Sequence, residues 1–330
     1  MAVTSKGTAA GLVDWRTVER LTALIPAGPS ASRSARASSV AVLRRSALEA
    51  PAWVARITGL NRAAQQVAET TRVSVVDRAG LVRASTQALR GLMEQVPAPQ
   101  ASEAVRLVGA AEMAGAMSLL ATRLLGQVVP ATGTGADGDG GRGGEASPHL
   151  LLVAPNVLAM RRQLDLDMLD LPAWVCLHEM THAVQLAAAP WLGPYLSDSM
   201  RMVIGAVVEA VYGGPGGGAD GTGEQGLRRR PGRAARIAAR AGRGRVLEGL
   251  TNFKERSEVA SLAAALTFLE GHAEVVLDDV HPNRMPSVHR LRAVLSRSRA
   301  ADAGIGPGPG LGSLLLHRLM GLEAKEAQYA

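Results

Sequence analysis

The segment from Trp174 to Leu186 constrains this 330-residue chain most, because it carries the pattern His-Glu-x-x-His inside an apolar stretch. Residues four apart on an α-helix lie about 40° apart on one face and about 6 Å apart along the axis. His178 and His182 can therefore bind one metal ion. Glu179 would flank that ion, where a carboxylate can take a proton from metal-bound water. The pattern predicts a helical zinc site that carries its own general base.

The residues around this pattern favour a helix over a loop. Pro172 suits a first helical turn, and Asp170 just ahead of it can act as an N-cap. Apolar residues then flank the histidines on both sides. The alternative is a buried core helix whose histidines only satisfy local hydrogen bonds, and a third ligand is needed to decide between the two.

A catalytic zinc site has three protein ligands and one open position. The best source of the third ligand is the segment 268–278, where Glu270, Glu274 and Asp278 recur every four residues and share one helix face. We predict Glu270 as the ligand, with Glu274 accepting a hydrogen bond from a ligand histidine. Glu274 as the ligand, with Asp278 behind it, is the alternative. An acidic, solvent-exposed stripe without a ligand is the third interpretation.

The combination of His-Glu-x-x-His with a distant Glu-Gly-His-Ala, at residues 270–273, resembles the gluzincin metallopeptidases. That resemblance implies that the glutamate of the second motif is the third zinc ligand. The chain also resembles an actinobacterial family of zincin-like metallopeptidases, one branch of which is associated with biosynthesis of the deazaflavin coenzyme. Besides the zinc motif, this resemblance rests on residues 13–15, 75–78, 154–156, 190–191, 269–278 and 321–329.

The composition favours helices. Hydrophobic residues make up 47% of the chain but aromatic residues only 3%, so the core must consist mainly of Ala, Leu and Val. Short apolar runs at residues 73–76 and 149–153 predict strands. We therefore expect a mainly α (α+β) zincin-like domain with a small sheet, in which residues 1–130 form an N-terminal helical part and residues 148–330 the catalytic part.

In zincins a strand ahead of the metal helix often lies at the cleft edge, so we expect residues 149–153 to pair with an extended substrate.

Two low-complexity segments interrupt this domain. Residues 131–147 are rich in glycine and lack the Gly-Lys-Ser/Thr of a phosphate-binding loop, so we expect a disordered linker. Residues 213–245 are rich first in glycine and then in arginine, and residues 228–245 carry much of the net charge of +7. We expect this basic insertion to be disordered as well. A nucleic-acid-binding arm is the alternative, but no interleaved aromatic residue supports base stacking.

The cysteine count and the hydropathy bear on location. Cys176 is the only cysteine, so the chain can form no intramolecular disulfide, and we expect a reducing compartment. The first residues are not followed by the long apolar core of a signal peptide. No run reaches the roughly 18 uninterrupted apolar residues of a membrane span. We therefore expect a cytoplasmic protein that does not bind a membrane.

Together these features predict a zinc-dependent hydrolase, most simply a metallopeptidase that cleaves an amide bond in a peptide or protein substrate. His178, His182 and Glu270 would hold Zn2+, with Glu179 as general base. Two alternatives stay open: a catalytically silent zincin-like protein that only binds zinc, and a small-molecule amide hydrolase linked to deazaflavin coenzyme metabolism. The donor that stabilises the oxyanion has four candidates: His272, Tyr195, His281 and His289.

Overall fold

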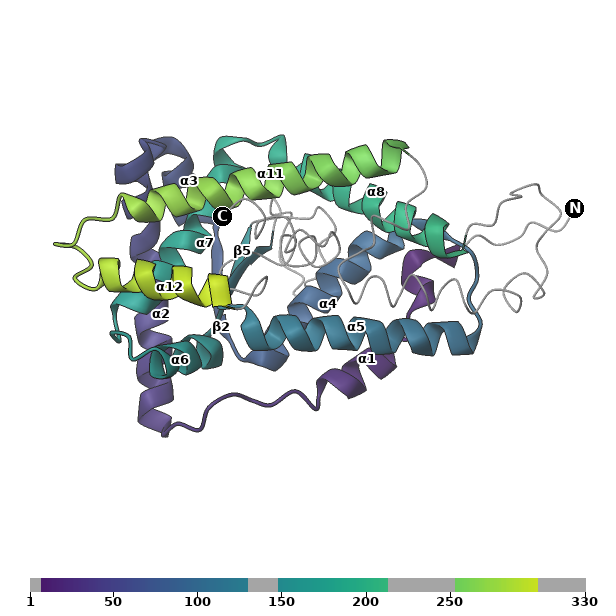
Figure 1. The fold of residues 1–330 in the computed structure, drawn as a ribbon, viewed down its shortest axis with the longest axis horizontal. Coiled ribbons are helices and arrows are strands. Elements are labelled where there is room, and N and C mark those ends of the chain that lie inside the picture. The colour runs from purple at the N-terminus through teal and green to yellow at the C-terminus, as the bar shows by residue number, and fades with distance from the viewer. Residues whose placement is uncertain (1–6, 130–147, 213–252, 302–330) are drawn as a thin grey trace, which may run out of the picture.

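Helices make up most of the chain in the computed structural model, which describes residues 7–129, 148–212 and 253–301 (Figure 1). In chain order the elements are β1 (Gly7–Thr8), a 3-10 helix (Ala9–Leu12), α1 (Trp15–Thr22), α2 (Arg33–Thr58), α3 (Asn61–Thr70), β2 (Arg72–Val76), α4 (Arg78–Glu94), β3 (Pro97–Ala98), α5 (Glu103–Arg123), β4 (Gly126–Val129), β5 (His149–Val153), α6 (Ala154–Gln163), α7 (Asp170–Ala188), α8 (Leu192–Tyr212), α11 (Phe253–Asp278) and α12 (Val288–Ala301). The prediction of a mainly α fold with a small sheet is confirmed.

The main sheet has three strands in the order β2–β5–β4. β2 runs parallel to β5, and β4 runs antiparallel to it, with Gly126 opposite Leu152. Residues 150–153 of β5 are all buried. β5 is therefore the central strand, and the expectation that residues 149–153 lie at an edge is wrong. A short, continuous apolar run is typical of a strand covered on both faces.

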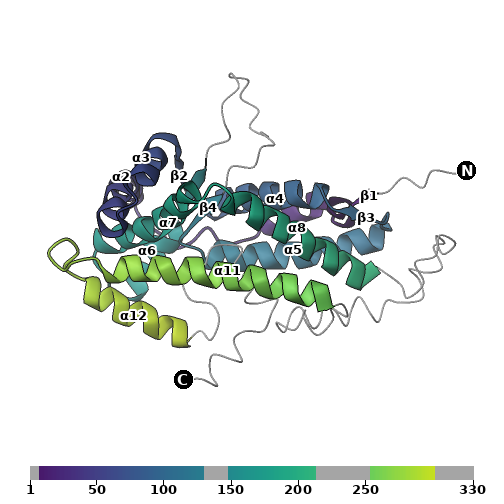
Figure 2. The same cartoon turned by 90° about the horizontal axis from the view of Figure 1, so that it is seen from above.

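α7, the helix of the His-Glu-x-x-His pattern, is buried on almost every side. It contacts α2, α3, α11 and β4, and Figure 2 shows it between α2 and α11. Thirteen of its residues, from Leu171 to Gln185, are buried. Cys176 is one of them: its thiol packs against the Leu43 carbonyl of α2, and burial raises its pKa. A helix buried all round must bring its polar side chains to internal partners.

The start of α7 differs from the predicted N-cap. α7 begins at Asp170 itself, and the carboxylate of Asp167 accepts hydrogen bonds from the N–H groups of Leu169 and Asp170. The Asp170 carboxylate instead accepts from the backbone N–H and the hydroxyl of Ser287, at 2.8 and 2.5 Å. Asp170 therefore ties α7 to the turn before α12 and does not cap its own helix.

Two of the short motifs, residues 75–78 and 154–156, meet where α5 gives way to β4. Asn156 is 3% exposed, and its Nδ2 donates to the carbonyls of Ala121 and Leu124 at 2.8 and 2.7 Å. Its Oδ1 accepts from Arg78 Nε at 2.7 Å. The last carbonyls of a helix have no intrahelical partner. Asn156 satisfies two of them and so fixes the point from which β4 starts.

Among the described residues, two helices are long and apolar enough to cross a membrane by length and composition alone: α5 and residues 257–278 of α11. Core helices of soluble proteins pass the same test. The predicted linker at 131–147, the basic insertion at 213–245 and the motif at 321–329 lie outside the described residues.

Asn156→Ala should lower the free energy of unfolding by about 2–3 kcal/mol, because it leaves two buried helix carbonyls and Arg78 without their shared partner. Urea denaturation of the purified chain measures this. Gln65→Ala is the control, since Gln65 is an exposed residue whose amide bonds the exposed Glu69; it should cost less than about 0.5 kcal/mol. An equally small loss for Asn156→Ala would contradict the anchoring role.

Candidate metal centre

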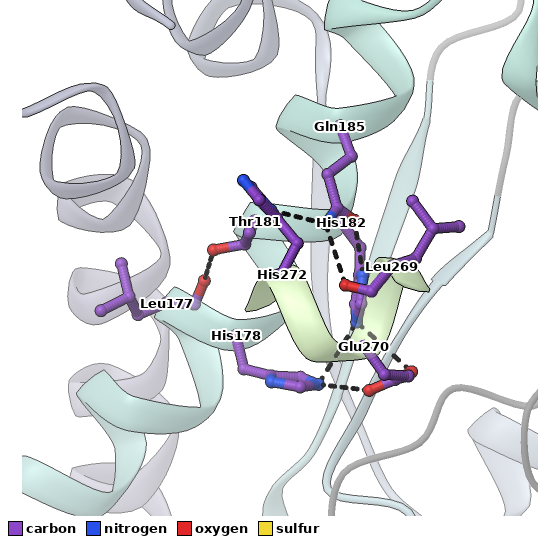
Figure 3. Close-up of polar contacts among 8 residues, drawn as sticks. All are labelled: Leu177, His178, Thr181, His182, Gln185, Leu269, Glu270 and His272. Atoms are coloured by element: carbon purple, nitrogen blue, oxygen red, sulfur yellow. Dashed lines mark hydrogen bonds and ion pairs between the residues drawn. The ribbon is translucent and has the colours of Figure 1, made fainter. Parts of the chain in front are cut away.

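Two helices that are distant in the sequence bring three candidate ligands together. His178 and His182 lie one turn apart on α7, and Glu270 lies on α11, which packs against α7. The two histidine Nε2 atoms are 3.3 Å apart (Figure 3). Glu270 Oε2 lies 3.3 Å from His178 Nε2, and Glu270 Oε1 lies 3.5 Å from His182 Nε2. These three residues form a group of possible metal ligands among the described residues, with one ligand atom from each, all within 4.8 Å of one another.

The spacing of these atoms fits a zinc ion. Zinc binds histidine nitrogen and carboxylate oxygen at about 2.0–2.2 Å, most often with tetrahedral geometry. Ligand atoms at tetrahedral positions then lie about 3.3–3.6 Å from one another. The separation of the two Nε2 atoms, 3.3 Å, falls in that range, and each Nε2 lies 3.3 or 3.5 Å from a different oxygen of the Glu270 carboxylate. Three ligands also leave the fourth position to water or substrate, as a catalytic site requires. The donor set therefore suits Zn2+, and its assignment as the ligand set stays a prediction.

Burial and charge together set the protonation of these residues. Burial raises the pKa of the Glu270 carboxyl, but hydrogen bonds from His178 and His182 outweigh burial and hold that pKa well below its usual value. Burial lowers the pKa of His182, but its hydrogen bond to Glu270 and the charge of that carboxylate raise it to about 9. Zinc binding at neutral pH would therefore displace a proton from His182.

Glu179 lies near the three ligands without belonging to them. The residue is 3% exposed, and burial raises the pKa of its carboxyl. The backbone N–H of Val128 on β4 donates to the carboxylate. Its Oε2 has no hydrogen-bond partner among the described residues. Burying a carboxylate oxygen without a hydrogen-bond partner costs free energy. The Oε2 atom is therefore suited to exchanging a proton with water or substrate.

Gly126, the first residue of β4, allows the strand to lie directly on Glu179. A Cβ atom at position 126 would lie 2.7 Å from Glu179 Cγ and 3.1 Å from its Cδ. Non-bonded carbon atoms keep about 3.5–4.0 Å between them. Any larger residue at this position would therefore push the carboxyl group aside.

The outer edge of β4 faces Glu179. The N–H of Val153 donates to the carbonyl of Leu125 at 2.8 Å, so these two residues form a hydrogen-bonded pair. Such pairs alternate along two antiparallel strands. The N–H and C=O groups of Gly126 and Val128 therefore point away from β5, in agreement with the bond from Val128 to Glu179. Within the described sheet, β4 and not β5 is the edge strand beside the candidate base.

Gln185 also contacts the centre, although no motif singles it out. Its amide lies 2.9 Å from His182 Nδ1 and 2.8 Å from His272 Nδ1. The signal in the sequence is its spacing: Gln185 follows His178 by seven residues and His182 by three, which places it on the same helix face. A polar residue at that spacing lies beside a ligand histidine and can serve as its hydrogen-bond partner.

The remaining candidates lie elsewhere. Glu274 is exposed on α11, and Asp278 pairs with Arg292 at 3.1 Å. For His182, the hydrogen-bond partner at Nδ1 is Gln185 and not Glu274.

None of the four oxyanion candidates is singled out by its contacts. His272 bonds the Gln185 amide, and the Tyr195 ring lies 6.2 Å from that of Trp191. His281 and His289 are exposed.

A His-Glu-x-x-His helix combined with a glutamate from a later helix is the arrangement of a zincin-type metal centre. The chain belongs to the family of zincin-like metallopeptidases, whose model matches residues 13–330. The fold is similar to the crystal structure of a proposed hydrolase with a novel fold from Chloroflexus aurantiacus, with a TM-score of 0.54 and 19% sequence identity over 94% of this chain and 81% of that one. No curated protein gives a significant match.

The family supports a zinc-dependent hydrolase, and the metal-ligand cluster is compatible with it. At 19% identity the structural likeness shows the fold alone. The comparisons do not distinguish an actinobacterial or a deazaflavin-associated branch, so that part of the resemblance stays a prediction.

We expect the purified chain to hold about one zinc ion, and Glu270→Ala to weaken zinc binding by more than about 100-fold, because changes outside the ligand set already cost up to that much. Glu274→Ala is the matched comparison one turn along the same helix, and it should weaken zinc binding far less, because Glu274 lies outside the group of candidate ligands. Competition with a chromophoric chelator measures both affinities. Loss of zinc in Glu274→Ala with full occupancy in Glu270→Ala would show that Glu274 is the ligand.

Proposed function

We propose that this chain is a zinc-dependent peptidase that cleaves an amide bond in an extended peptide or protein substrate. The observation that carries the proposal is the separation of two carboxylates. Glu270 lies against both histidines, whereas Glu179 is buried beside them with one oxygen that has no partner among the described residues. This difference supports a ligand role for Glu270 and a base role for Glu179.

His178, His182 and Glu270 would hold the zinc ion through Nε2, Nε2 and the carboxylate. When bound, zinc supplies a water of lowered pKa and polarises the scissile carbonyl. The three residues therefore bind and orient, and proton transfer is left to Glu179.

Glu179 would take the proton from the attacking water and pass it to the leaving nitrogen. Burial raises the pKa of its carboxyl, which increases its affinity for a proton. Since Oε2 has no partner among the described residues, the Val128 N–H bond goes to Oε1. One oxygen is then held by β4 while the other is available to the substrate.

The outer edge of β4 favours an extended peptide over a small molecule. An exposed strand edge can pair with a peptide backbone through main-chain hydrogen bonds. Val128 uses its outward N–H for Glu179, so a peptide would pair with the Val128 carbonyl and the outward groups of Gly126, and would run past the base. We also propose a cytoplasmic location, because a chain with a single cysteine forms no intramolecular disulfide and so suits a reducing compartment.

Glu179→Gln should fold and keep zinc but lose hydrolysis by at least about 10²–10⁴-fold, because an amide has the shape of the carboxyl group and cannot accept the proton. The assay is a cleavage screen on mixed peptides, with and without a chelator, and Glu274→Gln is the control. Unchanged cleavage by Glu179→Gln would mean another base. A zinc-loaded wild type that cleaves nothing would favour the silent zinc-binding protein, and cleavage of small amides alone would favour the small-molecule hydrolase.

Gly126→Ala should lower kcat by about 10–100-fold and leave zinc affinity unchanged, because the three atoms nearest the new Cβ all belong to Glu179 and none to a proposed ligand. Gly115→Ala on α5 is the control, since nothing lies within 4 Å of its would-be Cβ. Steady-state kinetics on a cleaved peptide and chelator competition give the two readings. Full activity in Gly126→Ala would contradict the idea that β4 positions the base.

A further inference from the structure

Gln185 joins both helices of the metal centre through one side chain. It lies on α7 one turn after His182 and is 9% exposed. Its Oε1 lies 2.9 Å from His182 Nδ1, while its Nε2 lies 2.9 Å from the Leu269 carbonyl and 2.8 Å from His272 Nδ1 (Figure 3). Leu269 and His272 are both on α11, on either side of Glu270.

These contacts fix which atom donates to which. The Leu269 carbonyl can only accept, so the Gln185 atom that faces it must be the amide nitrogen. The amide oxygen then faces His182, and His182 Nδ1 must carry the hydrogen. In the neutral imidazole this leaves the lone pair on Nε2, the atom that faces His178 and Glu270.

The same amide also sets the position of the third ligand. Its bond to the Leu269 carbonyl holds the residue directly before Glu270, so it holds the turn of α11 that carries the carboxylate. The bond to His272 Nδ1 adds a second contact on that turn. A histidine ligand from α7 and a glutamate ligand from α11 are thus held in register by one residue.

We propose that Gln185 is a positioning residue of the metal centre, which orients His182 Nε2 towards the metal and holds Glu270 against α7. This inference rests on the proposed metal site. It gives Gln185 a role that differs from that of Thr181, which is also buried on α7 but bonds only the Leu177 carbonyl of its own helix among the contacts seen.

The test compares zinc affinity, by chelator competition on the purified full chain, in the wild type, Gln185→Leu, Gln185→Glu and Thr181→Val. Gln185→Leu should bind zinc about 10–100-fold more weakly, the usual effect of removing a hydrogen-bond partner of a ligand histidine. Gln185→Glu keeps an acceptor for His182 Nδ1 and loses the donors to α11, so its loss should be smaller. Thr181→Val removes a buried hydroxyl without touching the centre, so its affinity should stay within about twofold of the wild type.

A second measurement needs no metal. In the zinc-free chain, hydrogen exchange of the amides around residues 269–273 should be faster in Gln185→Leu and in Gln185→Glu than in the wild type, because both lose the bond to Leu269. It should be unchanged in Thr181→Val. Hydrogen exchange in Gln185→Glu still tests the positioning role if Gln185→Leu does not fold, because Gln185→Glu keeps a polar side chain of the same size.

Three results would overturn the inference. They are wild-type zinc affinity in Gln185→Leu, an equal loss of affinity in Thr181→Val, or unchanged exchange on α11 in both Gln185 variants. Equal losses in Gln185→Leu and Gln185→Glu would contradict the role of the acceptor to His182. A wild type that binds no zinc would instead refute the metal site itself, so the two failures can be told apart.

Discussion

The site depends on the packing of α11 against α7. α7 is buried all round, and it places His178, Glu179 and His182 in the interior, where polar groups need partners. Glu270 supplies a partner to both histidines, and Gln185 bonds His182 and the α11 backbone together. The contacts that satisfy the polar groups of α7 are therefore the ones that bring the three proposed ligands together. The stability of this helix pair and the geometry of the centre cannot be varied separately.

Glu179, the proposed base, is held by other elements. The backbone of β4 lies on Glu179, closely enough that position 126 has no room for a Cβ atom, and Val128 donates to the carboxylate. β4 in turn starts where Asn156 holds the last carbonyls of α5. Ligands and base thus depend on different packing contacts, α7 with α11 in one case and α7 with β4 in the other. Changes on β4 can disturb proton transfer while the metal ligands stay in place.

Much of the site could be predicted from the sequence, and the rest depends on tertiary packing. The helical period alone fixes how His178, Glu179 and His182 lie relative to one another. Glu270 and Glu274 share a helix face, so their spacing cannot show which of them lies beside the histidines. The packing of α11 against α7 brings Glu270 there. β4 has four residues, begins with glycine and has no alternating pattern, so no sequence signal marks it as a strand. The order of strands in a sheet is likewise not a local property, so the pattern of residues 149–153 cannot distinguish a central strand from an edge strand.

The choice of glutamine at position 185 follows from the charge of a buried centre. Glu179 and Glu270 bring two carboxylates into a largely buried region, and a zinc ion would bring two positive charges, so the filled centre would be close to neutral. Net charge in the interior is costly. A carboxylate at 185 would add a third negative charge and could not donate to the Leu269 carbonyl. An amide accepts from His182 and donates to α11 without adding charge, so it meets the needs of the ligand and of the helix pair with one side chain.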